Sequence, residues 1–460
     1  MLEQINALLK KRRLIVFTKL KNSLYILIPL FCVCIWAFIA LYKDNFTLIP
    51  AADFSPCYYA AKYIFTEPEK IYFLEGQPYP YTPFFAILFF PMGFLSFEQA
   101  HIFFFVVLLI IAELIVIIFN QILILKKLSN KFYRLLFLIA ISNGIIYVQT
   151  FDTLPVRLLT AFGLIWFLKR EIKYRITERN LTKNKFIFTQ MMILSFAFGL
   201  TPQYTFLVLL YLFHNAKFKD FFSKFQIKRY LLFLFSFIIQ NFMLIVIYLI
   251  SPRAIESFIK GSSRGQRILG GDPITYSDIL TQRPRDPTDG ISITIRVLSQ
   301  YFDLSGIQIN ILLFSVIIMS IITLLIHLKQ NLTIENKFGL WALFSLFFYT
   351  YTYERYFVGL LPMITLLFLN YELNSDKNIL NFIKKNYLIL IGLLTIMILY
   401  FIPPIHYLIR VFPILMNLPI ALLYLKYIYV YLILSFALYM LHKKKQKYKI
   451  LIDKPADEIS

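Results

Sequence analysis

Cysteine and histidine are scarce in this chain of 460 residues, which has three of the first and five of the second. Cys32 and Cys34 lie inside one long apolar run and Cys57 lies beyond it, so no disulfide framework is readable. The histidines are scattered, and the segment 43–100 has no Asp-x-Asp pair. The sequence therefore gives no reason to require a metal or any other cofactor.

Charge is also sparse, because charged residues make up 16% of the chain and hydrophobic residues 59%. One soluble core could not bury so much apolar surface, so we predict an all-α polytopic membrane protein. The basic start is followed by an apolar run that is too long for a signal peptide, and no convincing small-residue cleavage site follows it. We expect this run to remain as the first membrane span.

Apolar runs that are long enough, or nearly so, to cross roughly 30 Å of hydrocarbon predict about twelve membrane helices. A further run from Pro83 to Leu95 is short and contains Pro91, so whether it crosses decides the orientation of every later helix. The twelve runs begin near Leu24, His101, Phe132, Leu154, Phe186, Tyr204, Tyr230, Ile307, Phe338, Tyr356, Tyr387 and Ile420.

The distribution of basic residues decides between the two orientations. If the short run stays at the outer surface, the basic clusters all fall on the side of the basic N-terminus, as the positive-inside rule requires. The excess of 47 Lys+Arg over 25 Asp+Glu is then a topogenic signal rather than a sign of nucleic-acid binding. These clusters lie at 126–134, 169–185, 217–229, 384–385 and 442–449.

This topology predicts one transmembrane domain over residues 24–442, with a cytoplasmic N-terminus (1–23) and a cytoplasmic tail (443–460). Two outer loops, 43–100 and 251–306, are large enough to hold an active site in water, and loops of such length are usually functional or disordered. The first contains a readable helix and many aromatic residues, which argues against disorder.

The first outer loop begins with an acid ahead of a short aromatic helix. Ser55-Pro56 is typical of an N-cap followed by the first helical residue, and "CYYAAKYIF" continues the helix. The helix dipole favours a carboxylate at this place, so Asp53 should be ionised and able to accept a proton. Asp53 could equally serve only to cap the helix, or to meet a cation at headgroup level.

A proline-rich elbow follows, in which Pro78, Pro80 and Pro83 favour an extended chain. The run from Phe84 to Leu95 then predicts a second short helix at the outer surface. Tyr81 lies at a level where tyrosine commonly anchors a protein to the membrane interface, so it needs no ligand to be explained.

An acid, a surface helix, a proline-rich elbow and a second surface helix together resemble the first outer loop of the GT-C class of membrane glycosyltransferases. The closest resemblance is to the polyprenyl-phosphate-mannose-dependent α-mannosyltransferases of glycosyltransferase family 87. Thr82 stands where the family's Tyr-x-Tyr-Pro-Pro elbow has its first proline. The Tyr-Thr-Pro sequence is instead similar to the catalytic subunit of the first glycosylphosphatidylinositol mannosyltransferase, so the linkage that would be formed stays open. The matching segments are Asp53-Phe54, Tyr58 to Ala61, Tyr79 to Pro83, and Ala86 to Met92.

Three weaker matches extend the resemblance, and the predicted topology places all of them on the side of Asp53. "VQTFD", with Gln149 and Asp152, stands where the family has Gly-Gln-x-Asn. "GLTPQY", with Gln203, is similar to the family's Lys-Pro turn. "YERYFVGLLP", with Glu354 and Arg355, resembles Trp-x-His-Tyr followed by Leu-Leu-Pro.

The resemblance implies a GT-C-like bundle that carries out an inverting hexosyl transfer, with mannose as the expected sugar and Asp53 as the general base. The donor would be a polyprenyl (dolichyl or undecaprenyl) phosphate sugar, and the acceptor a glycolipid or lipid-linked glycan. We expect a multi-pass protein of the plasma membrane with its active site on the outer face and no cofactor. The candidate substrate-binding residues are Tyr81, Pro83, Gln149, Asp152, Arg157, Gln203, Arg264, Arg267, Glu354 and Arg355.

Several alternatives stay open. Arg157 and Arg355 could bind the leaving phosphate, for which an Arg fork is well shaped, or could simply snorkel to the interface. Arg264 and Arg267 lie in a Gly-rich stretch that could close over a phosphate or be a solvated loop. Glu113, inside the second span, could be a buried structural partner. The whole chain could instead be a transporter or flippase of lipid-linked saccharides, or a non-catalytic polysaccharide-assembly subunit.

Overall fold

The computed structural model describes eleven stretches of the chain and some isolated residues between them. Within these stretches the secondary structure is helical and includes no strand, which confirms the all-α prediction for that part. The stretches are 26–42, 54–71, 83–126, 131–142, 157–177, 184–200, 223–253, 333–348, 362–369, 379–401 and 432–441.

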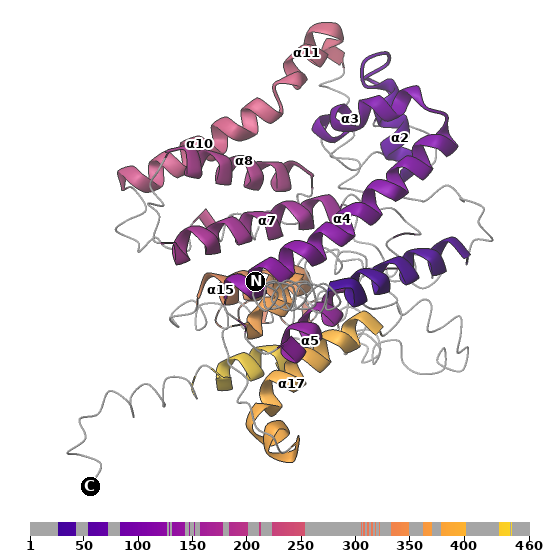
Figure 1. Cartoon of the computed structure of the whole chain (residues 1–460). Helices are drawn as coiled ribbons and strands as arrows, with labels where there is room; N and C mark the ends of the chain where they lie inside the picture. Colours follow the sequence, from indigo (N-terminus) through magenta and orange to yellow (C-terminus); the bar gives the residue numbers. More distant parts are fainter. Residues whose placement is uncertain are drawn as a thin grey trace, which may run out of the picture.

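The following helices succeed one another along the chain, and Figure 1 labels the α-helices among them. They are α2 (Phe54–Tyr63), α3 (Pro83–Phe89), η1 (Phe90–Phe94), α4 (Phe97–Leu125), α5 (Lys131–Ser142), α7 (Arg157–Ile176), α8 (Asn184–Leu200), α10 (Lys224–Gln240), α11 (Met243–Ile250), α15 (Ile334–Phe348), η6 (Leu366–Phe368) and α17 (Ile379–Phe401). The structure also describes the helices Ile26–Tyr42 and Leu432–Leu441 and a short helical turn at 362–365.

Two of the described helical segments, Phe97–Leu125 and Gln226–Ile247, are long and apolar enough to cross a membrane. Helix α4 has 29 residues, which corresponds to a length of about 43 Å at 1.5 Å per residue. The runs that begin near Tyr204 and Ile420 lie mostly outside the described residues, as do those near Ile307 and Tyr356. The number of twelve spans therefore stays a prediction.

The short apolar run that decides the orientation forms two elements rather than the one helix we predicted. It begins as α3 and continues as the 3₁₀ helix η1 from Phe90. Pro91 explains the change, because proline has no amide N–H to donate to an α-helical hydrogen bond. The two elements together have 12 residues, too few to cross roughly 30 Å of hydrocarbon as a helix.

Helix α4 begins directly after this turn, with a capping box that fixes its first residue. The Ser96 side chain accepts a hydrogen bond from the backbone N–H of Gln99, and the Gln99 side chain accepts one from the backbone N–H of Ser96. Two amide groups that a helix N-terminus would leave without partners are thereby satisfied. The long helix therefore starts at a defined point beside α2 and α3.

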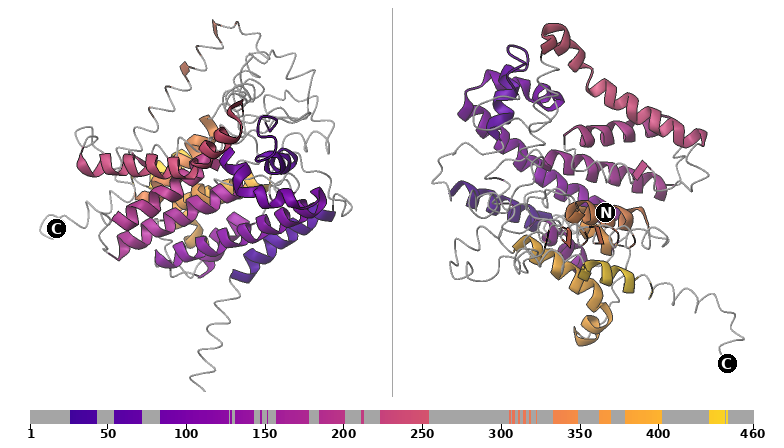
Figure 2. Two further views of the ribbon diagram at one scale, coloured as in Figure 1. Left: turned by 90° about the horizontal axis from the view of Figure 1, so that it is seen from above. Right: turned by 180° about the vertical axis from the view of Figure 1, so that it is seen from behind.

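The ends of several helices gather at two opposite sides of the molecule (Figure 1). At one end α2, α3 and η1 pack on the first turns of α4, and α11 joins them; the view from behind in Figure 2 shows the same grouping. Ser251, after α11, donates a hydrogen bond of 3.2 Å to Glu69, after α2. The Phe84 ring of α3 packs edge-on against Phe196 of α8, with centroids 5.8 Å apart. We call this the α2 end.

At the other end, the last turn of α4 meets the first turn of α15. Lys126 forms an ion pair of 2.5 Å with Glu335. The Phe167 ring, in the second half of α7, stacks with Phe338 of α15 at a centroid distance of 5.7 Å. We call this the basic end, because Lys126, Arg175, Arg229 and Lys337 lie there. Described residues from three of the predicted basic clusters, 126–134, 169–185 and 217–229, therefore meet at this end.

Candidate functional site

The predicted site lies at the α2 end, where α2 is anchored by its first residue. The Phe54 side chain is fully buried. Its ring contacts Phe97, His101 and Phe104 of α4 at centroid distances of 5.5, 5.1 and 5.4 Å. Aromatic pairs at such distances are worth about 0.5–1.5 kcal/mol each beyond the area they bury. The aromatic face predicted for this helix is therefore its buried face.

A second anchor lies one turn further along α2. The Tyr58 hydroxyl donates a hydrogen bond of 2.9 Å to the backbone carbonyl of Leu95, and the Tyr58 ring packs edge-on against Phe97 at 5.1 Å. Gly93 of η1 lies so close to α2 that a Cβ there would come within 2.8 Å of the Lys62 Cα. The two short helices and the start of α4 thus form one tightly packed unit, which we call the aromatic platform (54–63 and 83–104).

Helix α2 begins at Phe54, so the prediction that Ser55 caps it is wrong: Ser55 and Pro56 lie within its first turn. Proline is tolerated there because the first amide groups of a helix have no intrahelical acceptor. Asp53, which lies outside the described residues, directly precedes the first helical residue. Aspartate is a preferred residue before a helix, so capping alone would explain Asp53. A chemical role for Asp53 therefore needs an experimental test.

Two predicted site residues are described by the structure. Pro83 is the first residue of α3, as the elbow predicts. Arg157 is the first residue of α7, and only 4% of its surface is exposed. An arginine that snorkelled to the interface would expose its guanidinium group, so burial among protein side chains agrees poorly with that alternative.

The other predicted site residues cannot be compared with the structure. Asp53, Tyr81, Gln149, Asp152, Gln203, Arg264, Arg267, Glu354 and Arg355 all lie outside the described residues.

Glu113 is half-buried rather than buried, and it has a structural partner. The thiol of Cys34, in the helix Ile26–Tyr42, donates a hydrogen bond of 3.2 Å to its carboxylate. Glu113 thus links the first described helix to α4. In the described part of the chain, no group of three His, Cys, Asp or Glu residues could hold a metal ion.

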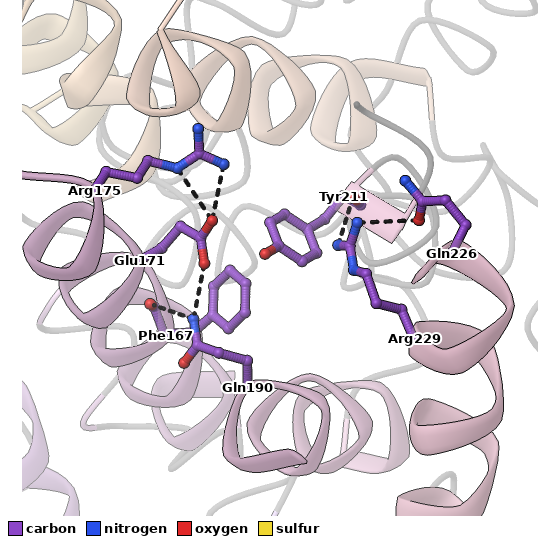
Figure 3. Close-up of polar contacts among 7 residues, drawn as sticks. All are labelled: Phe167, Glu171, Arg175, Gln190, Tyr211, Gln226 and Arg229. Atoms are coloured by element: carbon purple, nitrogen blue, oxygen red, sulfur yellow. Dashed lines mark hydrogen bonds and ion pairs between the residues drawn. The ribbon is translucent and has the colours of Figure 1, made fainter. Parts of the chain in front are cut away.

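The basic end contains a buried polar cluster that the sequence analysis did not predict (Figure 3). Glu171 of α7 is 3% exposed and accepts hydrogen bonds from Arg175 at 2.9 Å and from Gln190 of α8 at 3.2 Å. Gln190 also donates to the carbonyl oxygen of Phe167 and accepts from Arg170 at 3.2 Å. The segment 169–176, which belongs to the predicted basic cluster 169–185, is helical and holds this polar cluster between α7 and α8.

Tyr211 extends the cluster toward α10. Its ring lies between Glu171 and Arg229, and its hydroxyl points toward the Glu171 side (Figure 3). The Arg229 guanidinium lies over the Tyr211 ring at 5.0 Å and donates to the side chain of Gln226 at 3.2 Å. A sequence signal for part of this cluster did exist: Glu171 lies in a basic run, four residues before Arg175.

The chain matches no protein-family model, and no curated protein matches it significantly.

Proposed function

We propose that this chain is a multi-pass membrane glycosyltransferase of the GT-C class. It would move a hexose, mannose by resemblance, from a polyprenyl phosphate to a glycolipid or lipid-linked glycan at the outer face of the plasma membrane. The order of the motifs in the first outer loop supports the proposal, as does the all-helical structure of the described residues, which include two helical segments long and apolar enough to cross a membrane.

The chemistry requires one base and a site for the leaving phosphate. Asp53 takes the proton of the acceptor hydroxyl while the hydroxyl oxygen attacks the anomeric carbon of the donor. The bond from that carbon to the phosphate oxygen breaks, and the polyprenyl phosphate leaves with the bonding electron pair. The configuration at the anomeric carbon is inverted. Arginine side chains suit the developing phosphate charge, and Arg355 is the preferred candidate on the sequence match.

The aromatic platform is the observation that carries the proposal. A catalytic base is effective only when its backbone is held in place. Asp53 is joined directly to Phe54, whose ring is fully buried against three aromatic rings of α4. The platform therefore offers a rigid attachment for a reactive group at its edge, at the end of the molecule opposite the basic end.

Replacement of Asp53 by Asn tests the proposal. The full chain, reconstituted in vesicles, is given a radiolabelled polyprenyl-phosphate mannose and a lipid extract as acceptor. Asp53→Asn should lower transfer at least a hundredfold, because general base catalysis contributes about 10²–10⁴-fold. Asp44→Asn is the matched control, since it removes an identical charge from the same predicted loop and should keep full activity.

Two results would contradict the proposal. If Asp53→Asn transfers sugar as fast as the unmodified chain, Asp53 is a capping residue and not the base. If the unmodified chain moves a lipid-linked saccharide across the vesicle membrane without forming a glycosidic bond, the chain is a transporter or flippase. Insertion and folding of each variant are checked by size-exclusion chromatography, so that a loss of transfer is not a loss of protein.

A further inference from the structure

Cationic side chains surround the buried polar cluster at the basic end. In the described segments 166–177, 184–190, 223–230 and 333–341, together with Lys126, the acidic residues are Glu171 and Glu335. Both bind a cation already: Glu335 pairs with Lys126, and Glu171 with Arg175. The basic residues are Lys126, Lys169, Arg170, Lys173, Arg175, Lys185, Lys224, Lys228, Arg229 and Lys337.

Some of these cations repel each other. Partial burial lowers the pKa of Lys169, and the positive charge of Lys173 lowers it further. The pKa of Lys337 is likewise lowered by burial and then by Arg175. A like charge disfavours the protonated form of a lysine, whereas a bound anion would favour it. The described part of the basic end therefore has an excess of positive charge, which a negatively charged group would relieve.

An exposed apolar surface adjoins these cations on α10. Lys228 is followed at helical spacing by Leu231, Phe235 and Ile238, which are 60%, 53% and 52% exposed. Residues three and four apart lie on one side of a helix, so this side is apolar along its length and cationic at its first turn. Water disfavours such a surface, but a lipid covers its apolar part with acyl chains and its cationic part with a headgroup.

Aromatic residues lie beside these cations, in the middle and the last turn of α7 and in the first turn of α8. Trp166 is 38% exposed, and the Arg170 guanidinium lies 6.0 Å from its ring centroid. The rings of Tyr174 and Phe186 stack at 3.8 Å, which joins the last turns of α7 to the first turn of α8. Tryptophan and tyrosine are enriched where a membrane helix reaches the lipid headgroups.

We propose that the basic end binds an anionic phospholipid. The headgroup phosphate lies among the cations at the ends of α7, α8 and α10, and an acyl chain runs along the exposed side of α10. Lys173 and Lys185 supply accessible charge, since both are exposed and each neighbours one ring of the stacked Tyr174 and Phe186 pair. The inference rests on the membrane location proposed above but not on the transfer reaction.

The test measures lipid affinity and needs no activity. The full chain in nanodiscs of phosphatidylcholine is titrated with fluorescent phosphatidylglycerol. Each basic residue near an anionic surface adds about 1 kcal/mol, so Lys173→Gln with Lys185→Gln should weaken binding about thirtyfold. The matched control, Lys62→Gln with Lys70→Gln, removes two exposed lysines at the α2 end and should leave the affinity unchanged.

Three results would overturn the inference. The first is equal binding of phosphatidylglycerol and a zwitterionic probe by the unmodified chain. The second is an equal loss of affinity in the control pair, which would show that only overall charge matters. The third is displacement of the lipid by inorganic phosphate at equal concentration, which would show a headgroup site without an acyl-chain site. A salt titration of the unmodified chain does not depend on the folding of any variant: affinity should fall as the Debye length decreases to about 3 Å at 1 M salt.

Discussion

Replacement of Gly93 by Ala tests whether the aromatic platform is as rigid as its contacts indicate. A Cβ at this position would come within 2.8 Å of the Lys62 Cα, and within 3.1 Å of both the Ala61 carbonyl oxygen and the Lys62 amide nitrogen. All three are backbone atoms of α2, so no side-chain rotation can make room. The methyl group must instead push α2 away from η1.

The structure gives an approximate size for this effect. Inserting a methyl group into a well-packed region typically costs about 1–3 kcal/mol. The displacement would also strain the hydrogen bond from Tyr58 to Leu95, which holds the same helix. We therefore expect Gly93→Ala to lower the free energy of unfolding by about 1–3 kcal/mol, and sugar transfer to fall with it if the platform positions the base.

Gly163→Ala is the matched control, because the same methyl group is added inside α7 with room around it. Its nearest neighbours would be side-chain carbons of Ile193 and Phe196, both at 3.9 Å, an ordinary contact distance. Alanine is favoured over glycine in a helix, so this variant should be stabilised by about 0.4–1 kcal/mol. Thermal unfolding of both variants in one detergent gives the comparison. A Gly93→Ala protein as stable as Gly163→Ala would refute the close packing of α2 on η1.

Two further substitutions test single contacts. Tyr58→Phe removes the hydrogen bond to the Leu95 carbonyl and should destabilise the chain by about 0.5–1.5 kcal/mol, measured by thermal unfolding; no change would mean that the hydroxyl contributes nothing. Gly392→Ala places a Cβ 2.2 Å from the Phe368 ring. It should lower stability by about 1–3 kcal/mol, and Phe368→Leu in the same chain should restore part of the loss. Absence of this coupling in a double-mutant cycle would contradict the packing of α17 on η6.

Hydropathy predicted the helices well where a run is long and uninterrupted. The run near His101 became α4, and the runs near Leu154 and Phe186 became α7 and α8. The position of such a helix follows from the apolar and basic residues of its own segment, so it can be predicted from a single sequence. The same local reasoning missed the capping box at Ser96 and Gln99, although the pattern Ser-x-x-Gln was there to be recognised.

The polar cluster at the basic end could not be predicted in the same way. Glu171 binds Gln190, which is 19 residues away on the next helix, and lies near Tyr211 beyond that (Figure 3). Which residues meet across helices depends on the rotation of each helix about its axis. Charge counting fixes the end at which a residue lies, but not the direction in which its side chain points. The sequence therefore placed Glu171 only within a basic cluster, whereas the fold buries its side chain.

The two ends of the molecule are built by different physical means, and this difference bears on where chemistry can take place. Hydrophobic and aromatic packing holds the α2 end, so a reactive group at its edge can change charge without disturbing its support. Ion pairs and hydrogen bonds hold the basic end, where Glu171 and Glu335 each bind a cation. If one member of such an ion pair lost its charge, the buried charge of the other would have no partner, which costs about 3–5 kcal/mol. Proton transfer is therefore more compatible with the α2 end, and fixed anion binding with the basic end.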